Sequence, residues 1–297
     1  MYMSILTITK HLGRLGNNMT YILNAIDYCI KNNFNVLKFG PSIPSNVHRL
    51  NILIEGDSMV ISDPTLNHDK AAENKGFWGH YFYRGEVPFS RRRELCLTYI
   101  VPKLKFKPSP IDPNALVIHI RGGDIFDRQH YAYVQPPLSF YENIINSRKW
   151  STIYLCSENN KNPCFDILKK KYNCVSCLDN RDRHGGNYWG FQEDLSLMIG
   201  ATHFVASKTS LSPLIIYLSK TIQHVYLADY FLRTGGSSFE KAENSVWWSN
   251  ELTNKKSDFH YGGIDFHVQN YTKYIEMFNK TNYDLSKKCN SRLLVEN

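Results

Sequence analysis

The feature that most constrains the fold of this chain is a short apolar run near its middle, Ala115–Ile120, which leads into the polar turn Arg121–Asp124. A near-continuous apolar run of this length is typical of a strand that is buried on both faces. Such strands belong to parallel sheets whose two faces are covered by helices. The run therefore predicts an α/β domain built around a buried sheet.

Strand and helix patterns alternate on both sides of this run. Before it, Ser4–Thr9 alternates like a strand, a glycine turn follows, Met19–Lys31 has the helical period, and Asn35–Phe39 is the next strand. After it, helices are expected at residues 138–147, 164–172, 191–200 and 213–218, and strands at 152–156, 174–177, 203–206 and 224–227. This alternation favours an α/β architecture for the whole chain.

A proline-rich segment divides the alternating pattern into two parts. Residues 104–114 hold three prolines and no periodicity, which is typical of a linker. We therefore predict two α/β domains that face a cleft, over residues 1–108 and 109–297. Residues 235–263 are polar and receive no element, and residues 268–278 have the pattern of a terminal helix that can return to the first domain.

Composition excludes several classes of protein. With 42% hydrophobic and 21% charged residues over 297 positions, the chain has globular usage and is not disordered, collagenous or coiled coil. Its longest apolar run, Leu211–Leu218, contains Ser212, Pro213 and Tyr217, so no membrane-spanning helix is expected. The seven cysteines are an odd number and thinly spread, which favours reduced thiols, and the lone Cys174–Cys177 pair lacks further ligands for zinc.

The first residues of the chain and its net charge indicate where the protein is located and which kinds of partner it binds. The first residues lack the basic segment and the cleavage site of a signal peptide, so a cytoplasmic protein is expected, in the host cell if the source is a virus. The net charge of +8 suits nucleic acid, an anionic membrane surface or a nucleotide phosphate. No RRM, KH or helix-turn-helix signature is present, which disfavours nucleic acid. The runs Arg91–Arg93 and Lys169–Lys171 are interpreted as solvated helix faces.

The sharpest chemical feature is His119–Asp124 (HIRGGD), directly after the buried strand. Open α/β sheets bind ligands beyond the carboxyl ends of their strands. There, Gly122 and Gly123 let the backbone approach a ligand, and the guanidinium of Arg121 offers a fork of donors to phosphate oxygens. The segment predicts a diphosphate clamp, and the alternative is a strand-ending turn with a surface arginine.

Two further segments suggest anion chemistry. The turn Gly13–Asn18 feeds a helix N-terminus, which favours an anion, although it is neither a GxGxxG fingerprint nor a P-loop. Glu193-Asp194 precedes a hydroxyl-rich turn, Ser207–Ser212, that can bind phosphate or ribose, while a carboxylate can accept hydrogen bonds from guanine. The alternatives are a tight strand–helix turn for the first segment and helix capping for the others. No DxD pair in an apolar setting is found, so no metal is expected.

Together these segments resemble one known family. His119–Asp124 is similar to the HxRxGD motif of the α1,2-, α1,6- and protein O-fucosyltransferase superfamily. Gly13–Met19 (GRLGNNM) resembles the GGLGNQM opening of the α1,2-fucosyltransferases, glycosyltransferase family 11, and Gly76–Tyr83 resembles their GYWQ-type segment. Asp194 followed by Ser210 resembles the Asp–helix–strand–Ser block of that family. The motifs occur in the family's order over residues 8–228.

The resemblance implies a GT-B fold, in which two Rossmann-like domains face a cleft and the C-terminal one holds the nucleotide. It implies an inverting, metal-independent glycosyltransferase that moves a sugar, usually L-fucose from GDP-fucose, to a hydroxyl of an acceptor glycan. The partners would then be a nucleotide-sugar donor and a glycan, with no cofactor. The residues implied in donor binding are Gly13, Arg14, Gly16, Asn17, His119, Arg121, Gly122, Asp194, Thr209 and Ser210.

The implied roles in the C-terminal domain divide by ligand group. Arg121 would bind the diphosphate and stabilise it as it leaves, and Thr209 and Ser210 would contact phosphate. The backbone near His119 and the carboxylate of Asp194 would recognise the guanine. These roles come from the family's motifs, matched position by position.

In the N-terminal domain, the resemblance implies a loop that closes over the donor. Gly13 and Gly16 would permit that closure, with Arg14 or Asn17 near the phosphates. The family has Gly where Arg14 stands, and this departure leaves other donors open, among them GDP-rhamnose, GDP-mannose and UDP-xylose.

A catalytic base is expected close to the HIRGGD segment. The candidates are Asp127, Asp124 and His130, with Asp127 ranked first, and Asp124 can instead support the arginine loop. A module that binds a nucleotide sugar or a glycan without catalysis is the alternative from another class.

Overall fold

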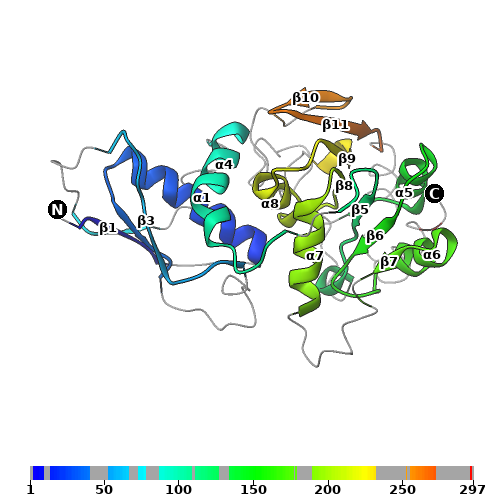
Figure 1. The fold of residues 1–297 in the computed structure, drawn as a ribbon, viewed down its shortest axis with the longest axis horizontal. Coiled ribbons are helices and arrows are strands. Elements are labelled where there is room, and N and C mark those ends of the chain that lie inside the picture. Colours follow the sequence, from blue (N-terminus) through cyan, green and yellow to red (C-terminus); the bar gives the residue numbers. More distant parts are fainter. Residues whose placement is uncertain are drawn as a thin grey trace, which may run out of the picture.

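The computed structural model describes residues 3–9, 14–40, 53–66, 73–77, 87–108, 111–126, 134–176, 178, 189–231, 252, 255–271 and 295. Within these residues the chain forms a four-stranded and a seven-stranded sheet, with helices packed on both (Figure 1). Most neighbouring strands run parallel. The α/β class predicted from the alternating pattern is therefore confirmed.

The smaller sheet is built from the start of the chain. Its elements are β1 (Ile5–Ile8), α1 (Leu15–Lys31), β2 (Val36–Lys38), β3 (Ser58–Val60) and β4 (Lys75–Phe77). The strand order is β3-β2-β1-β4, with β1 parallel to both β2 and β4 and with β3 antiparallel at the edge. In chain order, α1 is the element that follows the carboxyl end of β1.

The larger sheet carries the rest of the alternating pattern. Its elements are β5 (Leu116–His119), α5 (Leu138–Asn146), β6 (Ile153–Cys156), α6 (Pro163–Tyr172), β7 (Val175–Ser176), α7 (Trp189–Gly200), β8 (His203–Val205), α8 (Leu211–Leu218), β9 (His224–Ala228), β10 (Phe259–Tyr261) and β11 (Ile264–Gln269). The strand order is β10-β11-β9-β8-β5-β6-β7. Without the antiparallel edge strand β10, and with β5 counted as the first, this is the order 3-2-1-4-5-6.

The position of β5 explains the apolar run that it contains. All four of its residues are buried, because β6 and β8 pair with it on its two edges and helices cover its faces. The chain leaves β5 toward β6 and later returns on the other side to β8. In sheets of this order, that change of direction creates a crevice beyond the carboxyl end of the first strand.

The helix α4 (Phe89–Leu95), which continues through η1 (Cys96–Ile100) and η2 (Val101–Lys103), links the two sheets. The ring of Phe89 packs on Tyr217 of α8 at 5.2 Å between centroids, and on the edge hairpin formed by β10 and β11. In Figure 1, α1 and α4 lie between the small sheet and α8. The contact is apolar and aromatic, which favours a fixed geometry between these helices.

The interpretation of Arg91–Arg93 as a solvated helix face is wrong for two of its three residues. Arg92 is 1% exposed, and its Nε donates to the carbonyl of Val87 at 3.1 Å. Arg93 donates to the carbonyls of Ser219 and Gly262, at 3.2 and 2.9 Å. The run therefore ties α4 to the end of α8 and to the turn between β10 and β11.

The end of the described chain differs from the predicted terminal helix. Val268 and Gln269 are the last residues of β11, which pairs in parallel with β9. Residues 272–278 lie outside the described residues, as do most of residues 235–263. The part of that polar segment that the structure does describe includes β10 and the turn into β11.

Candidate functional site

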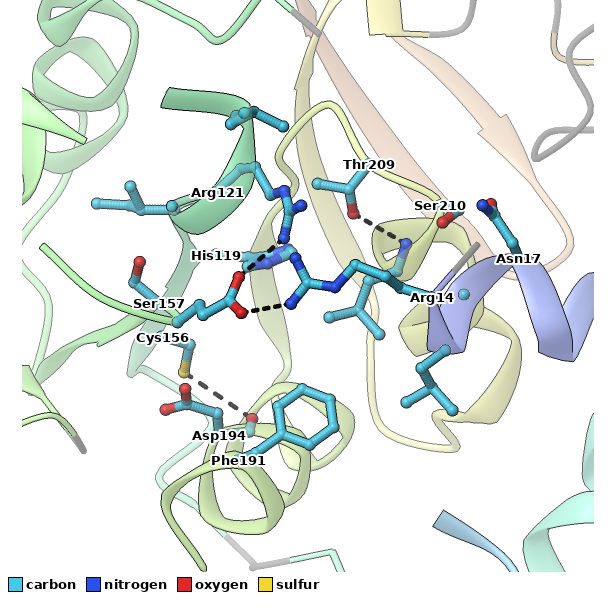
Figure 2. A pocket seen from close by; sticks show the side chains of 17 residues that line it. Arg14, Asn17, His119, Arg121, Cys156, Ser157, Phe191, Asp194, Thr209 and Ser210 are labelled. Atoms are coloured by element: carbon cyan, nitrogen blue, oxygen red, sulfur yellow. Dashed lines mark hydrogen bonds and ion pairs between the residues drawn. The ribbon is translucent and has the colours of Figure 1, made fainter. Parts of the chain in front are cut away.

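A cavity of about 210 Å³ lies beyond the carboxyl ends of β5, β6 and β8 (Figure 2). The turn after each of these strands contributes to its lining, and α7 and the N-terminus of α1 complete it. Nine of the residues predicted to bind a donor line this one cavity: Arg14, Gly16, Asn17, His119, Arg121, Gly122, Asp194, Thr209 and Ser210. The structure thus brings together the three sequence features that were predicted separately.

The structure does not describe the side chains of the other predicted site residues. Gly13, Asp127 and His130 lie outside the described residues. Asp124 is described only as part of the backbone of the short turn η3 (Gly123–Phe126). The proposed catalytic base therefore stays a prediction from the sequence.

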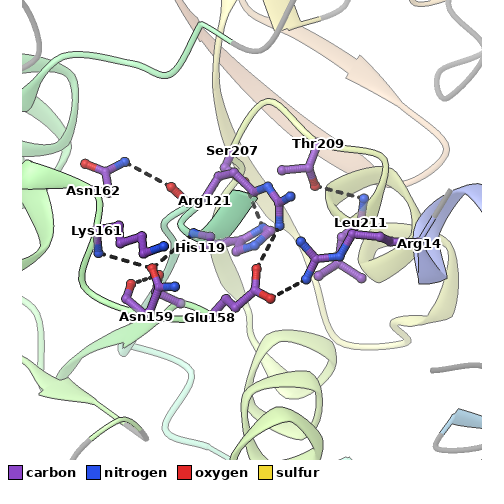
Figure 3. A network of polar contacts seen from close by, with 12 residues as sticks. Arg14, His119, Arg121, Glu158, Asn159, Lys161, Asn162, Ser207, Thr209 and Leu211 are labelled. Carbon is purple, nitrogen blue, oxygen red and sulfur yellow. Dashed lines mark hydrogen bonds and ion pairs between the residues drawn. The ribbon is translucent and has the colours of Figure 1, made fainter. Parts of the chain in front are cut away.

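Two arginines from distant parts of the chain converge on one carboxylate in the cavity. The Nη2 atom of Arg14 lies 2.5 Å from Oε1 of Glu158, and the Nη1 atom of Arg121 lies 3.3 Å from Oε2 of the same residue (Figure 3). Arg14 immediately precedes α1, whereas Arg121 follows β5 and Glu158 follows β6. The two guanidinium groups form a positively charged wall suited to the oxygens of a phosphate or carboxylate.

The backbone around Arg121 is held by asparagines from the neighbouring strand end. The side chain of Asn162 donates to the carbonyl of Arg121 at 3.2 Å, and Oδ1 of Asn159 accepts from the N–H of Gly123 at 3.0 Å. Gly123 has φ +75°, and a Cβ there would overlap the carboxylate of Glu158. A glycine is therefore required where this turn passes the acidic side chain.

The side chain of His119 fastens β5 to the turn before α8. It is buried, and its Nδ1 lies 2.9 Å from Oγ of Ser207 and 3.3 Å from Oγ of Ser212. The pKa of His119 is lowered to about 3, mainly by burial and then by the positive charge of Arg121, while Glu158 opposes this shift. The imidazole is therefore neutral at neutral pH and acts as a hydrogen-bonded anchor between two strand ends.

Two helix N-termini meet at the cavity. A Cβ on Gly16 in the first turn of α1 would lie 2.5 Å from the Oγ and the carbonyl carbon of Ser210, which precedes α8. The N-cap residues Arg14 and Ser210 make no side-chain capping hydrogen bond, although Oγ1 of Thr209 accepts from the N–H of Leu211 at 2.9 Å. Neither helix has an acidic residue in its first turn. Helix N-termini attract anions through their N–H groups and dipoles. They add to the positive potential of the two arginines.

The opposite wall of the cavity has a different chemistry. Phe191 and Asp194 are three residues apart on α7 and thus share one helix face. The carboxylate of Asp194 is buried, and the ring of Phe191 is partly buried beside it (Figure 2). An aromatic face next to a carboxylate suits a flat heterocycle that carries two adjacent N–H donors, such as guanine.

Some lining residues were missed by the sequence analysis. Ser157 and Glu158 follow β6, and Phe191 lies one turn before Asp194. A signal for the first two was present, because the carboxyl ends of adjacent parallel strands share one sheet edge. Nothing in the sequence distinguishes Phe191 from a core aromatic residue.

Comparison of the chain with protein-family models, with curated protein sequences and with solved structures gave no match. Among the residues that the structure describes, no helix has the length and apolar character needed to cross a membrane. Over the same part of the chain, no three His, Cys, Asp or Glu side chains gather into a group that can hold a metal ion.

Proposed function

We propose that the chain is an inverting, metal-independent glycosyltransferase that moves L-fucose from GDP-fucose to a hydroxyl of an acceptor glycan. One observation carries the proposal. A single cavity holds two arginines and two helix N-termini on one side and a carboxylate beside an aromatic ring on the other. This arrangement suits a nucleoside diphosphate, whose charged part and flat base need these two environments. The two sheets would then be the two Rossmann-like domains of a GT-B enzyme.

The arginine wall supplies the chemistry that a leaving diphosphate needs. In the proposed reaction, an acceptor hydroxyl attacks the anomeric carbon while the bond from that carbon to the phosphate oxygen breaks. The electron pair goes to the diphosphate, whose added charge is stabilised by Arg121, Arg14 and the N-termini of α1 and α8. The proton of the hydroxyl passes to a base, for which Asp127 and Asp124 are the candidates.

The carboxylate of Asp194 favours a guanine donor over a uracil donor. Its two oxygens can accept from the N1–H and the exocyclic amine of guanine, whereas uracil offers a single N–H at the corresponding edge. The same feature leaves the sugar open, because GDP-mannose and GDP-rhamnose carry the same base. The identity of the sugar and of the acceptor must therefore be determined by experiment.

The test is thermal stabilisation by a panel of GDP, GDP-fucose, GDP-mannose, UDP and UDP-xylose, with and without EDTA. A ligand at 100 times its dissociation constant stabilises the folded state by about 2.7 kcal/mol, which gives a measurable rise in melting temperature. We expect a rise with the GDP ligands that EDTA leaves unchanged. The Arg121→Gln variant should lose it, whereas Arg148→Gln, whose side chain stacks on Trp150, should keep it.

The outcomes separate the alternatives. A rise with UDP compounds alone would remove the guanine role from Asp194. A silent panel would refute the nucleotide site. Release of GDP in the presence of acceptor glycans distinguishes an enzyme from a module that binds the nucleotide sugar without turnover, and an unchanged Arg121→Gln variant would refute the role given to that arginine.

A further inference from the structure

The cavity contains a carboxylate at the place where an anionic ligand would bind. Each oxygen of Glu158 engages one arginine, Oε1 with Arg14 and Oε2 with Arg121. A diphosphate that binds the two guanidinium groups from within the cavity would compete for the same donors. The proposed ligand and Glu158 therefore exclude one another at these atoms.

The geometry allows the side chain of Glu158 to leave while its backbone stays in place. The segment around it is fixed, because Ser157 donates to the carbonyl of Asn159 at 2.7 Å and the Asn159 side chain holds Gly123. The side chains of Arg14, Arg121 and Glu158 are 34%, 15% and 27% exposed, so all three reach the open part of the cavity. A glutamate side chain has rotatable bonds enough to turn aside without moving the strand end.

We propose that Glu158 is a positioning residue that holds Arg14 and Arg121 in place in the empty protein and exchanges with the diphosphate of the ligand. This inference rests on the proposed function, since it takes the cavity to be a diphosphate site. In the empty state the carboxylate offsets the repulsion between two guanidinium groups. In the bound state the phosphates take over that task, and Glu158 turns away.

The exchange has a consequence for affinity. A ligand that takes Nη2 of Arg14 and Nη1 of Arg121 displaces Glu158 from two ion pairs, so the carboxylate lowers affinity for a diphosphate bound through these atoms, including the one left after transfer. A neutral side chain of the same shape removes this competition. Partly exposed ion pairs are individually weak, and loss of both should tighten diphosphate binding by about fivefold to tenfold.

The experiment measures binding of inorganic pyrophosphate and of GDP by calorimetry, to the wild-type protein, Glu158→Gln and Glu158→Asp. We expect Glu158→Gln to bind both ligands about fivefold to tenfold more tightly and Glu158→Asp, which keeps the charge, to remain near wild type. The gain should shrink in 0.5 M salt, because salt screens the ion pairs. If Glu158→Gln fails to fold, the Glu158→Ser variant, which also lacks the negative charge, is used in its place.

A matched control exists outside the cavity, on α5 and α6. Glu142 on α5 also pairs with a basic residue, Lys171 at 2.7 Å, and its side chain is 23% exposed. The Glu142→Gln variant should bind both ligands as the wild-type protein does. A structural role for Glu158 would lower both melting temperature and affinity, whereas exchange lowers the melting temperature of the empty protein and raises affinity.

The outcomes separate this inference from the proposed function. If the wild-type protein binds GDP and Glu158→Gln binds it equally or less tightly, the exchange is refuted while the nucleotide site stands. If no form of the protein binds pyrophosphate or GDP, the site and the exchange fail together. Tighter binding by the Glu142→Gln control would show that the effect is one of overall charge, which also refutes the exchange.

Discussion

The contact between the first turns of α1 and α8 predicts an unusual sign for one substitution. Replacing glycine by alanine inside a helix ordinarily stabilises a protein, by up to about 1 kcal/mol. Gly16 lies in the first turn of α1, so helix propensity alone predicts that Gly16→Ala is stabilising. The tertiary contact with Ser210 predicts the opposite.

The magnitude follows from the space around Gly16. A Cβ there would lie 2.5 Å from the carbonyl carbon and the Oγ of Ser210 and 2.6 Å from its carbonyl oxygen, whereas ordinary contacts begin at 3.4 Å. The two helices must therefore separate by about 1 Å, and overpacking of this kind costs about 1–3 kcal/mol. Set against the propensity gain, we expect Gly16→Ala to lose about 1–2 kcal/mol of unfolding free energy.

The assay is urea denaturation followed by circular dichroism, with pyrophosphate binding measured on the same samples. Two of the three close atoms belong to the backbone of Ser210, so Ser210→Ala should rescue only a minor part of the loss in Gly16→Ala. Ser210→Ala alone, the control, should be near neutral, because its side chain makes no capping bond to α8. A higher urea midpoint for Gly16→Ala would refute the close approach of the two helices.

Three further predictions concern recognition of the nucleobase, the pH dependence of stability and the contact between α4 and α8. Asp194→Asn should weaken GDP binding by about tenfold or more while pyrophosphate binding, measured by calorimetry, stays near wild type, since only the base would meet this side chain. The pKa of His203 is lowered to about 4, mainly by burial and then by the charges of its neighbours, with the stacked His224 foremost, so the unfolded state binds more protons than the folded state between pH 6.5 and 4. The urea midpoint of unfolding should therefore decrease as the pH is lowered through that window, and it should decrease less in His203→Phe. Equal dependence of the midpoint on pH in the two proteins would contradict this. Phe89→Ala removes a ring packed on Tyr217 and should cost about 3–5 kcal/mol in the same assay, whereas a loss below about 1 kcal/mol would contradict the packing.

Elements with strong hydrophobic periodicity were predictable from the sequence. Their observed boundaries differ from the predicted ones where tertiary contacts determine them. The helix predicted from Met19 begins at Leu15, because Gly16 and its neighbours carry no apolar period and become helical against α8. The run Arg91–Arg93 indicated a helix face, and α4 is that helix, but its charged residues carry no signal that Arg92 is buried. The strand β11 was misread at its end, although Ile264 and Phe266 alternate at the period of a strand.

The candidate site was predictable only where a strand end and a recognisable turn coincide. The placement of Arg121 and Ser210 in one cavity follows from parallel strands that share an edge, which a sequence pattern can predict. Glu158 belongs to no motif, and its importance arises from two ion pairs whose partners lie far away in the chain. The shared edge of β5 and β6 places Glu158 near the site, but its two ion pairs are found only in the structure.

The bridge between Arg14 and Glu158 joins residues 144 positions apart, and this sets an order of events during synthesis. At about 5–20 residues per second, the ribosome needs about 7–29 s to add the intervening chain. The small sheet and α1 can form during that interval, with the arginine exposed and without its partner. The contact with Ser210 requires a still longer wait, so the cavity is among the last features of the molecule to be completed. A nascent or truncated chain that stops before β8 would display the first half of the cavity without Thr209 and Ser210.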